Sequence, residues 1–246
     1  MKICIRDDET HETLERRVHD LFLGNPGYLA RTESHWEDYF VEEELKLLNQ
    51  SLDVGHPVLR MIVSEAQKIL EEIASKSACE LRSKDSRYNQ AFLVAETRYH
   101  AELFQPAYKA AVHVLELLGE QEADHDLAYA ALSAVRGLGP HHPVEAAIVL
   151  ERMYEKNRFL AAIIWGFCEI SSLRAIDVYI EAYQRYKDVK DPEIDLKFIG
   201  RRVLEAFPYD EVEGRVSALQ DLVVRESCSA FFETLRKTRE ESDVRE

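Results

Sequence analysis

Apolar residues recur at spacings of three and four along nearly the whole chain, and few turn-forming residues interrupt them. In the first such stretch Leu14, Val18 and Leu21 fall on one side of a helix. Glycine and proline, which end helices and form tight turns, number only nine and seven among 246 residues. Folds built from many short strands need more of these residues, so the sequence predicts an all-α protein.

Start and stop signals bound the first three helices. A helix is predicted over about residues 9–23, before a Gly-Asn-Pro-Gly turn. A Ser-His-Trp-Glu capping box predicts that the next helix begins at Ser34. A third helix is predicted over residues 57–78, with a proline suited to its first turn. Ahead of them, residues 1–6 alternate apolar with polar and predict a short extended arm.

Beyond residue 86 the predicted helices form pairs. The first helices of successive pairs begin about 33–36 residues apart, which is the range of helical repeats. The links between helices are short, for example residues 137–140 and 169–172. Links of this length make consecutive helices antiparallel neighbours. The corresponding positions are Leu93, Leu127, Leu160 and Leu196.

Leu127–Gly139 followed by Val144–Leu150 resembles a HEAT-type repeat, and so does Leu160–Phe167 followed by Arg174–Tyr179. The resemblance implies antiparallel helix pairs stacked as a short α-solenoid over about residues 86–225. An irregular helical bundle is the alternative.

The polar stretch around residue 83 suggests a boundary within the chain. The predicted parts are an N-terminal helical region (1–82), a helical-repeat-like region (83–235) and a charged C-terminal tail (236–246). One continuous domain is the alternative.

The charge of the chain restricts its partners. Asp and Glu number 46 against 31 Lys and Arg, a formal net charge of −15. This charge repels phosphate backbones and anionic membranes and attracts a basic partner. The four cysteines are widely spaced, without a C-x-x-C pair, which indicates a reducing, cytoplasmic location. The uncharged stretch 159–168 is too short to cross a bilayer.

Two histidine patterns are candidate metal ligands. His11, Glu15 and His19 share one helical face, but the two histidines are about 12 Å apart along the axis, so one ion cannot bind both. Glu122 and His125 form an E-x-x-H pattern, of which di-iron bundles need two copies. A second copy does not occur in the sequence, so no metal or other cofactor is predicted.

Two stretches suit partner binding. The predicted helix at residues 33–44 carries six acidic residues, three aromatic residues and no Lys or Arg. Aromatic side chains beside carboxylates are typical of a surface that binds a basic protein. A tyrosine stripe follows the predicted second helix of a later pair; for both stretches, packing in the core is the alternative. The candidate contacts are Trp36, Glu37, Asp38, Tyr39, Glu42, Glu43, Glu44, Tyr179, Tyr183 and Tyr186.

These features predict a non-enzymatic protein-binding module. An inhibitor, an immunity-type protein that occludes a toxin, or an adaptor fits an acidic chain of this kind. One alternative is a metal-dependent all-α enzyme with ligands from separate helices. The other is a HEAT-like nucleic-acid-binding protein similar to helical-repeat DNA glycosylases. The negative net charge argues against this alternative, because it repels nucleic-acid phosphates.

Overall fold

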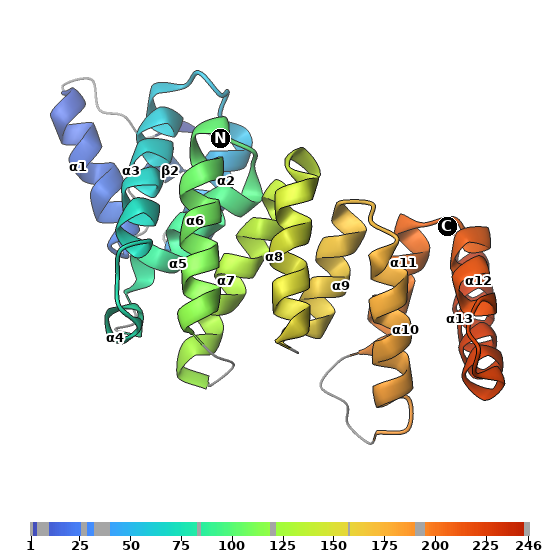
Figure 1. The fold of residues 1–246 in the computed structure, drawn as a ribbon. Coiled ribbons are helices and arrows are strands. Elements are labelled where there is room, and N and C mark those ends of the chain that lie inside the picture. Colours follow the sequence, from blue (N-terminus) through green and yellow to red (C-terminus); the bar gives the residue numbers. More distant parts are fainter. Residues whose placement is uncertain are drawn as a thin grey trace. The chain divides into compact units, whose positions relative to one another are not determined.

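The computed structural model describes residues 2–3, 10–25, 29–31, 40–82, 85–118, 122–156, 158–189 and 195–243. Over these residues it contains thirteen α-helices, one short 3-10 helix and one pair of two-residue strands (Figure 1). The prediction of an all-α protein is confirmed.

The chain divides into two compact units, unit 1 (Met1–His141) and unit 2 (His142–Glu246). The boundary predicted near residue 82 lies inside unit 1. Helix α3 (Pro57–Ile73) precedes that point and packs against α5 (Ser86–Thr97) and α6 (Ala101–Leu117), which follow it. The helices before and after residue 82 pack against one another and therefore belong to the same unit.

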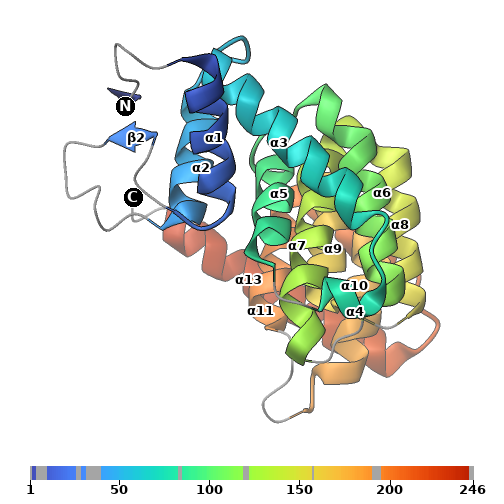
Figure 2. The ribbon, with the colours of Figure 1, turned by 90° about the vertical axis from the view of Figure 1, so that its left-hand side faces the viewer.

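The N-terminal part of unit 1 begins with a minimal sheet. Strand β1 (Lys2–Ile3) pairs antiparallel with β2 (Ala30–Arg31) at the edge of the unit (Figure 2), so the extended arm is confirmed at these two residues. Helix α1 (His11–Phe22) matches the predicted first helix. Its apolar face, including Val18, is buried, and the helix packs on α3.

Helix α2 (Val41–Ser51) begins later than predicted. The residue before it, Phe40, has an extended backbone, so a helix from Ser34 cannot run unbroken into α2; the capping box itself lies outside the described residues. Helix α3 starts at the predicted proline but ends at Ile73. A capping box at Ser77, which the sequence reading missed, starts the separate short helix α4 (Ala78–Leu81).

The core of unit 1 lies among α3, α5, α6 and α7 (Glu122–Leu138). Helices α3 and α7 each pack against both α5 and α6. Gly137 lies inside α7 and not in the predicted link; the 3-10 helix η2 (Gly139–His141) forms the turn. A Cβ at Gly137 would lie 2.4 Å from the carbonyl oxygen of Glu96, so the missing side chain permits close packing of α7 on α5.

Over its described residues, unit 2 contains six helices. They are α8 (Pro143–Glu155), α9 (Leu160–Glu169), α10 (Arg174–Tyr186), α11 (Leu196–Ala206), α12 (Tyr209–Ser217) and α13 (Leu222–Asp243).

Helix α9 packs against α8, α10 and α11, and α10 also contacts α11, α12 and α13. Helices α12 and α13 are separate elements, and the predicted tail from residue 236 continues α13 as far as Asp243. The stacking of helix pairs into a solenoid stays a prediction.

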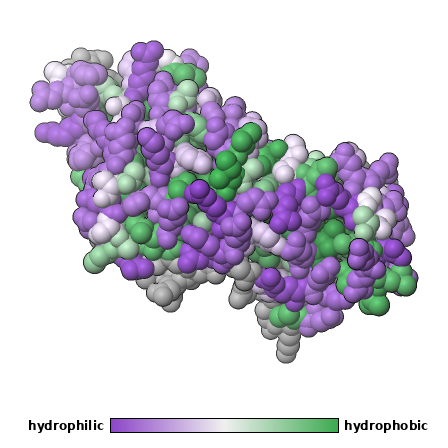
Figure 3. Space-filling view, viewed as in Figure 1, coloured by the Kyte–Doolittle hydropathy of each residue, from purple (hydrophilic) through white to green (hydrophobic). Residues whose placement is uncertain are grey.

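Among the described helices, none is both long and apolar enough to cross a lipid bilayer. Figure 3 shows one face of the protein, on which hydrophilic side chains predominate over the helices of unit 1.

Candidate functional site

The structure describes part of the predicted acidic and aromatic surface. Trp36, Glu37, Asp38 and Tyr39 lie outside the described residues. Phe40 precedes α2 with 75% of its surface exposed, and Glu42 and Glu43 are exposed in the first turn of that helix.

Glu44, in contrast, is buried. Its Oε1 accepts a hydrogen bond of 2.7 Å from the backbone N–H of Leu29, so it holds the preceding chain and is not offered to a partner.

A cavity of about 440 Å³ lies next to this exposed part of α2. Its walls are one face of α5, from Ser86 to Glu96, and one face of α7, from His125 to Ser133. Glu42 of α2 completes the lining. We call this cavity the acidic pocket. The sequence reading missed it, because the residues of α5 and α7 meet only through tertiary packing.

Among the described residues, the lining of the acidic pocket contains three carboxylates, on Glu42, Glu96 and Asp126, and no Lys or Arg. Glu96 Oε1 accepts a hydrogen bond of 2.9 Å from Nη2 of Arg136, which is not among the lining residues. The Asp126 carboxylate is exposed and lies 3.8 Å from His125 Nδ1. The pocket therefore has a negative field that one neighbouring arginine only partly offsets.

Two further lining side chains, Tyr129 and Gln90, add an aromatic ring and an amide to the acidic pocket. The Tyr129 ring is 42% exposed and stacks nearly parallel on the His125 ring, with centroids 6.0 Å apart. The Gln90 side chain is only 9% exposed, and its Oε1 is buried without a hydrogen-bond partner among the described residues. The pocket thus combines an aromatic face with an acceptor that lacks a donor.

A buried polar network holds α2 against α5 and so positions Glu42. Asn49, which is fully buried, donates through Nδ2 to the carbonyl oxygen of Val94 at 2.9 Å. Its Oδ1 lies 2.7 Å from His100 Nε2, which carries the proton because the amide oxygen can only accept. Arg98 donates to the carbonyl oxygens of Asn49 and Leu52. None of these partners was predicted from the sequence.

The predicted tyrosine stripe of unit 2 is largely internal. Tyr179 is fully buried and donates to the carbonyl oxygen of Leu196 at 2.8 Å. Tyr183 is 6% exposed, and its hydroxyl lies 2.9 Å from Ser227 Oγ. Tyr186 alone of the three is partly exposed. The alternative of core packing therefore holds for Tyr179 and Tyr183, which point inward at helical spacing.

The histidine face of α1 lines a second cavity of about 630 Å³ against α3. His11 Nε2 lies 3.5 Å from Glu15 Oε1, while His19 Nδ1 lies 2.8 Å from Glu65 Oε1. Burial opposes ionisation of Glu65, but hydrogen bonds from His19 and Lys68 outweigh it and hold its pKa below the ordinary value. The two histidines thus belong to separate pairs.

No group of three or more His, Cys, Asp or Glu side chains in the described parts of the chain is arranged to hold a metal ion. The lining of the α1–α3 cavity mixes acidic side chains with Arg16, Arg60 and Lys68. It therefore lacks the single sign of charge found in the acidic pocket.

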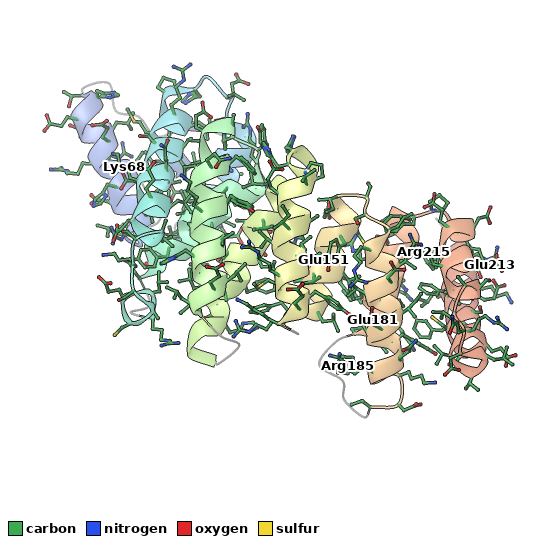
Figure 4. The ribbon with its side chains drawn as sticks, viewed as in Figure 1. Lys68, Glu151, Glu181, Arg185, Glu213 and Arg215 are labelled. Carbon is green, nitrogen blue, oxygen red and sulfur yellow. The ribbon has the colours of Figure 1, made fainter. Side chains whose placement is uncertain are left out.

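Glu151 and Glu181 mark a charged cluster on unit 2 (Figure 4). Arg174 Nε lies 3.0 Å from Glu151 Oε1, and its Nη1 lies 3.5 Å from Glu181 Oε1. Burial, with a contribution from Glu151, raises the pKa of Glu181. The guanidinium also covers the Tyr154 ring at 4.7 Å, so this cluster ties α8 to α10.

Comparisons of the chain with family models, with curated proteins and with solved structures gave no match. The HEAT-type resemblance therefore rests on the residues that carry it and stays a prediction. Arguments about function accordingly start from the acidic pocket and the exposed start of α2.

Proposed function

We propose that this protein is an interaction module, of the inhibitor or adaptor class, that binds a basic protein in the cytoplasm. The binding surface is formed by the exposed start of α2 and the adjoining acidic pocket of unit 1. Stacked helix pairs, which we propose for about residues 86–225, suit this role because they bury their own core and leave a large surface exposed.

The acidic pocket is the observation that carries this proposal. In the described part of the chain, three carboxylates and no Lys or Arg line it, and Glu43 adds a further exposed carboxylate next to Glu42. A side chain as apolar and as exposed as Phe40 is typical of a contact residue at the centre of an interface. The net charge of −15 adds long-range attraction for a basic partner.

The test measures association with a fluorescein-labelled lysine-rich peptide by stopped-flow fluorescence over a range of salt concentrations. The Glu42→Lys/Glu43→Lys variant reverses the local charge. We expect its association rate at low salt to fall about tenfold or more, with a weaker dependence on salt, because steering depends on local potential.

The matched control is Glu211→Lys/Glu213→Lys, which makes the same change in net charge at exposed positions of α12; Glu213 is labelled in Figure 4. This control separates local charge from the total charge of the molecule. Equal slowing in both variants, or no slowing in the α2 variant, would contradict the proposed surface.

A further inference from the structure

We propose that the acidic pocket receives an arginine side chain of the basic partner. This inference rests on the proposed function and adds to it the chemistry that the pocket recognises. Three observations carry it: an acceptor without a donor, an excess of carboxylates, and an exposed aromatic ring.

The first observation is the Gln90 amide. Its side chain is 9% exposed and lines the acidic pocket, and its Oε1 has no hydrogen-bond partner among the described residues. Buried polar atoms are almost always hydrogen-bonded, because a lost bond to water must be replaced. A ligand that brings an N–H donor into the pocket supplies the missing partner once the Gln90 side chain turns its Oε1 toward the pocket.

The second observation is the charge of the lining. Glu42 contributes from α2 and Asp126 from α7, and Asp126 is 90% exposed along its side chain. Glu96 is already paired with Arg136, so the first two carboxylates are the ones that a ligand meets. The donor that reaches Gln90 is therefore carried by a cation, since charge-assisted bonds to these carboxylates strengthen its binding.

The third observation is the exposed Tyr129 ring, which together with the arrangement of the acceptors favours arginine over lysine. The acceptors come from three helices, α2, α5 and α7, so they approach a ligand from different directions. A guanidinium directs five N–H groups outward in one plane, whereas an ammonium is a compact point charge. The Tyr129 ring, 42% exposed, offers a face on which a guanidinium stacks. Leu93 and Ala130 in the same lining suit the aliphatic stem.

The experiment uses the full chain and three labelled peptides of glycine, serine and lysine that differ only at one central residue. That residue is arginine, lysine or citrulline, and affinity is measured by fluorescence anisotropy. Citrulline keeps the shape of arginine but removes its charge. We expect the arginine peptide to bind about tenfold more tightly than the other two. Free arginine amide serves as a competitor and is expected to bind much more weakly than the peptide.

The Gln90→Leu variant tests the pocket itself. It removes the unpartnered acceptor while keeping the side-chain volume nearly constant, so its melting temperature is expected to equal or exceed that of the wild type. The preference for arginine is expected to disappear. Gln184→Leu, on an exposed position of α10, is the matched control and is expected to keep the preference.

The outcomes separate this inference from the proposed function. Equal binding of all three peptides, still weakened by Glu42→Lys/Glu43→Lys, would overturn the arginine pocket and leave the basic-partner surface standing. Retention of the arginine preference in Gln90→Leu would also overturn the pocket, as would free arginine amide binding as tightly as the peptide. Absence of binding by every basic peptide at low salt would overturn both proposals.

Discussion

At the residue scale, a missing side chain sets the distance between two helices that form the acidic pocket. Gly137 lies inside α7, where a Cβ would approach the backbone of Glu96 in α5. Backbone atoms cannot move aside as the end of a flexible side chain can. The close packing of α5 and α7, and with it the width of the pocket, therefore depends on glycine at this position.

Replacing Gly137 with alanine is expected to lower the free energy of unfolding by about 1–3 kcal/mol, because α7 must move away from α5. Urea denaturation measures this change. The control is Gly214→Ala in α12, where a Cβ would meet nothing within 4 Å. That substitution is expected to raise stability by about 0.5–1 kcal/mol through the better helix propensity of alanine. Equal effects at both positions would contradict the packing argument.

The described cysteines differ in their surroundings. Cys79 is exposed, whereas Cys168 and Cys228 are buried free thiols. Burial raises the pKa of Cys168 and of Cys228 to about 12. Because the thiolate is the reactive form, iodoacetamide at pH near 8 is expected to modify Cys79 long before the other two. Peptide mapping by mass spectrometry follows the labelling, and rapid modification of Cys228 would show that α13 opens readily.

At the scale of the elements, a polar network joins α2 to α5 and to the start of α6. His100 is 4% exposed and bonds to Asn49. Burial, reinforced by the charge of Arg98, holds the pKa of His100 below its ordinary value of 6.5. The folded protein therefore binds this proton less readily than the unfolded chain does, and the network loses stabilising energy as pH falls below 6.5.

The His100→Gln variant is expected to show a flatter dependence of stability on pH between about pH 7 and pH 5, because the titrating group is gone. Its stability near pH 7 is expected to fall by about 1 kcal/mol through the altered hydrogen bond. Urea denaturation at a series of pH values measures both effects. His11→Gln, which changes an exposed histidine of α1, is the control and should keep the wild-type slope.

The helices were largely predictable, because their apolar spacing and local caps are properties of neighbouring residues. Helix α1 and the start of α3 at Pro57 agree with the prediction. The predicted start of α2 was wrong, since Phe40 has an extended backbone although good helix formers follow it. The prediction that Gly137 lies in a link was wrong as well. Glycine usually indicates a helix end, whereas here close packing on α5 favours glycine inside α7.

The candidate site was predictable only where it lies on a single element. Glu42 and Glu43 are exposed, as partner contacts must be, but Glu44 falls in register with the buried Val41 and Leu48 and points inward. Helical spacing could have identified that orientation. The role of Gln90 could not be found in this way, because it depends on the pairing of α5 with α7.

At the scale of the whole molecule, an acidic excess governs how copies of the chain behave toward one another. The formal net charge is −15 and the isoelectric point is about 5.1. Mutual repulsion at neutral pH opposes contact between copies, and this repulsion disappears as the net charge approaches zero.

Light scattering is therefore expected to increase as the pH is lowered from about 8 toward 5.1, and to increase further with added salt away from that point. The Glu211→Lys/Glu213→Lys variant, with fewer negative charges, should reach its scattering maximum at a higher pH. An unchanged maximum would show that local contacts, and not the total charge, control self-association.

The inward turn of Glu44 has a consequence for anyone who redesigns this surface. Glu42, Glu43 and Glu44 are the same amino acid in succession, yet a saturation scan scored by folding stability should find the first two positions tolerant of substitution and the third intolerant. Neutralising Glu42 or Glu43 changes the charge of the proposed binding surface but breaks no internal hydrogen bond among the described residues, whereas shortening Glu44 leaves the backbone N–H of Leu29 without its acceptor. Efforts to recharge this face for a new target should therefore leave that third position untouched.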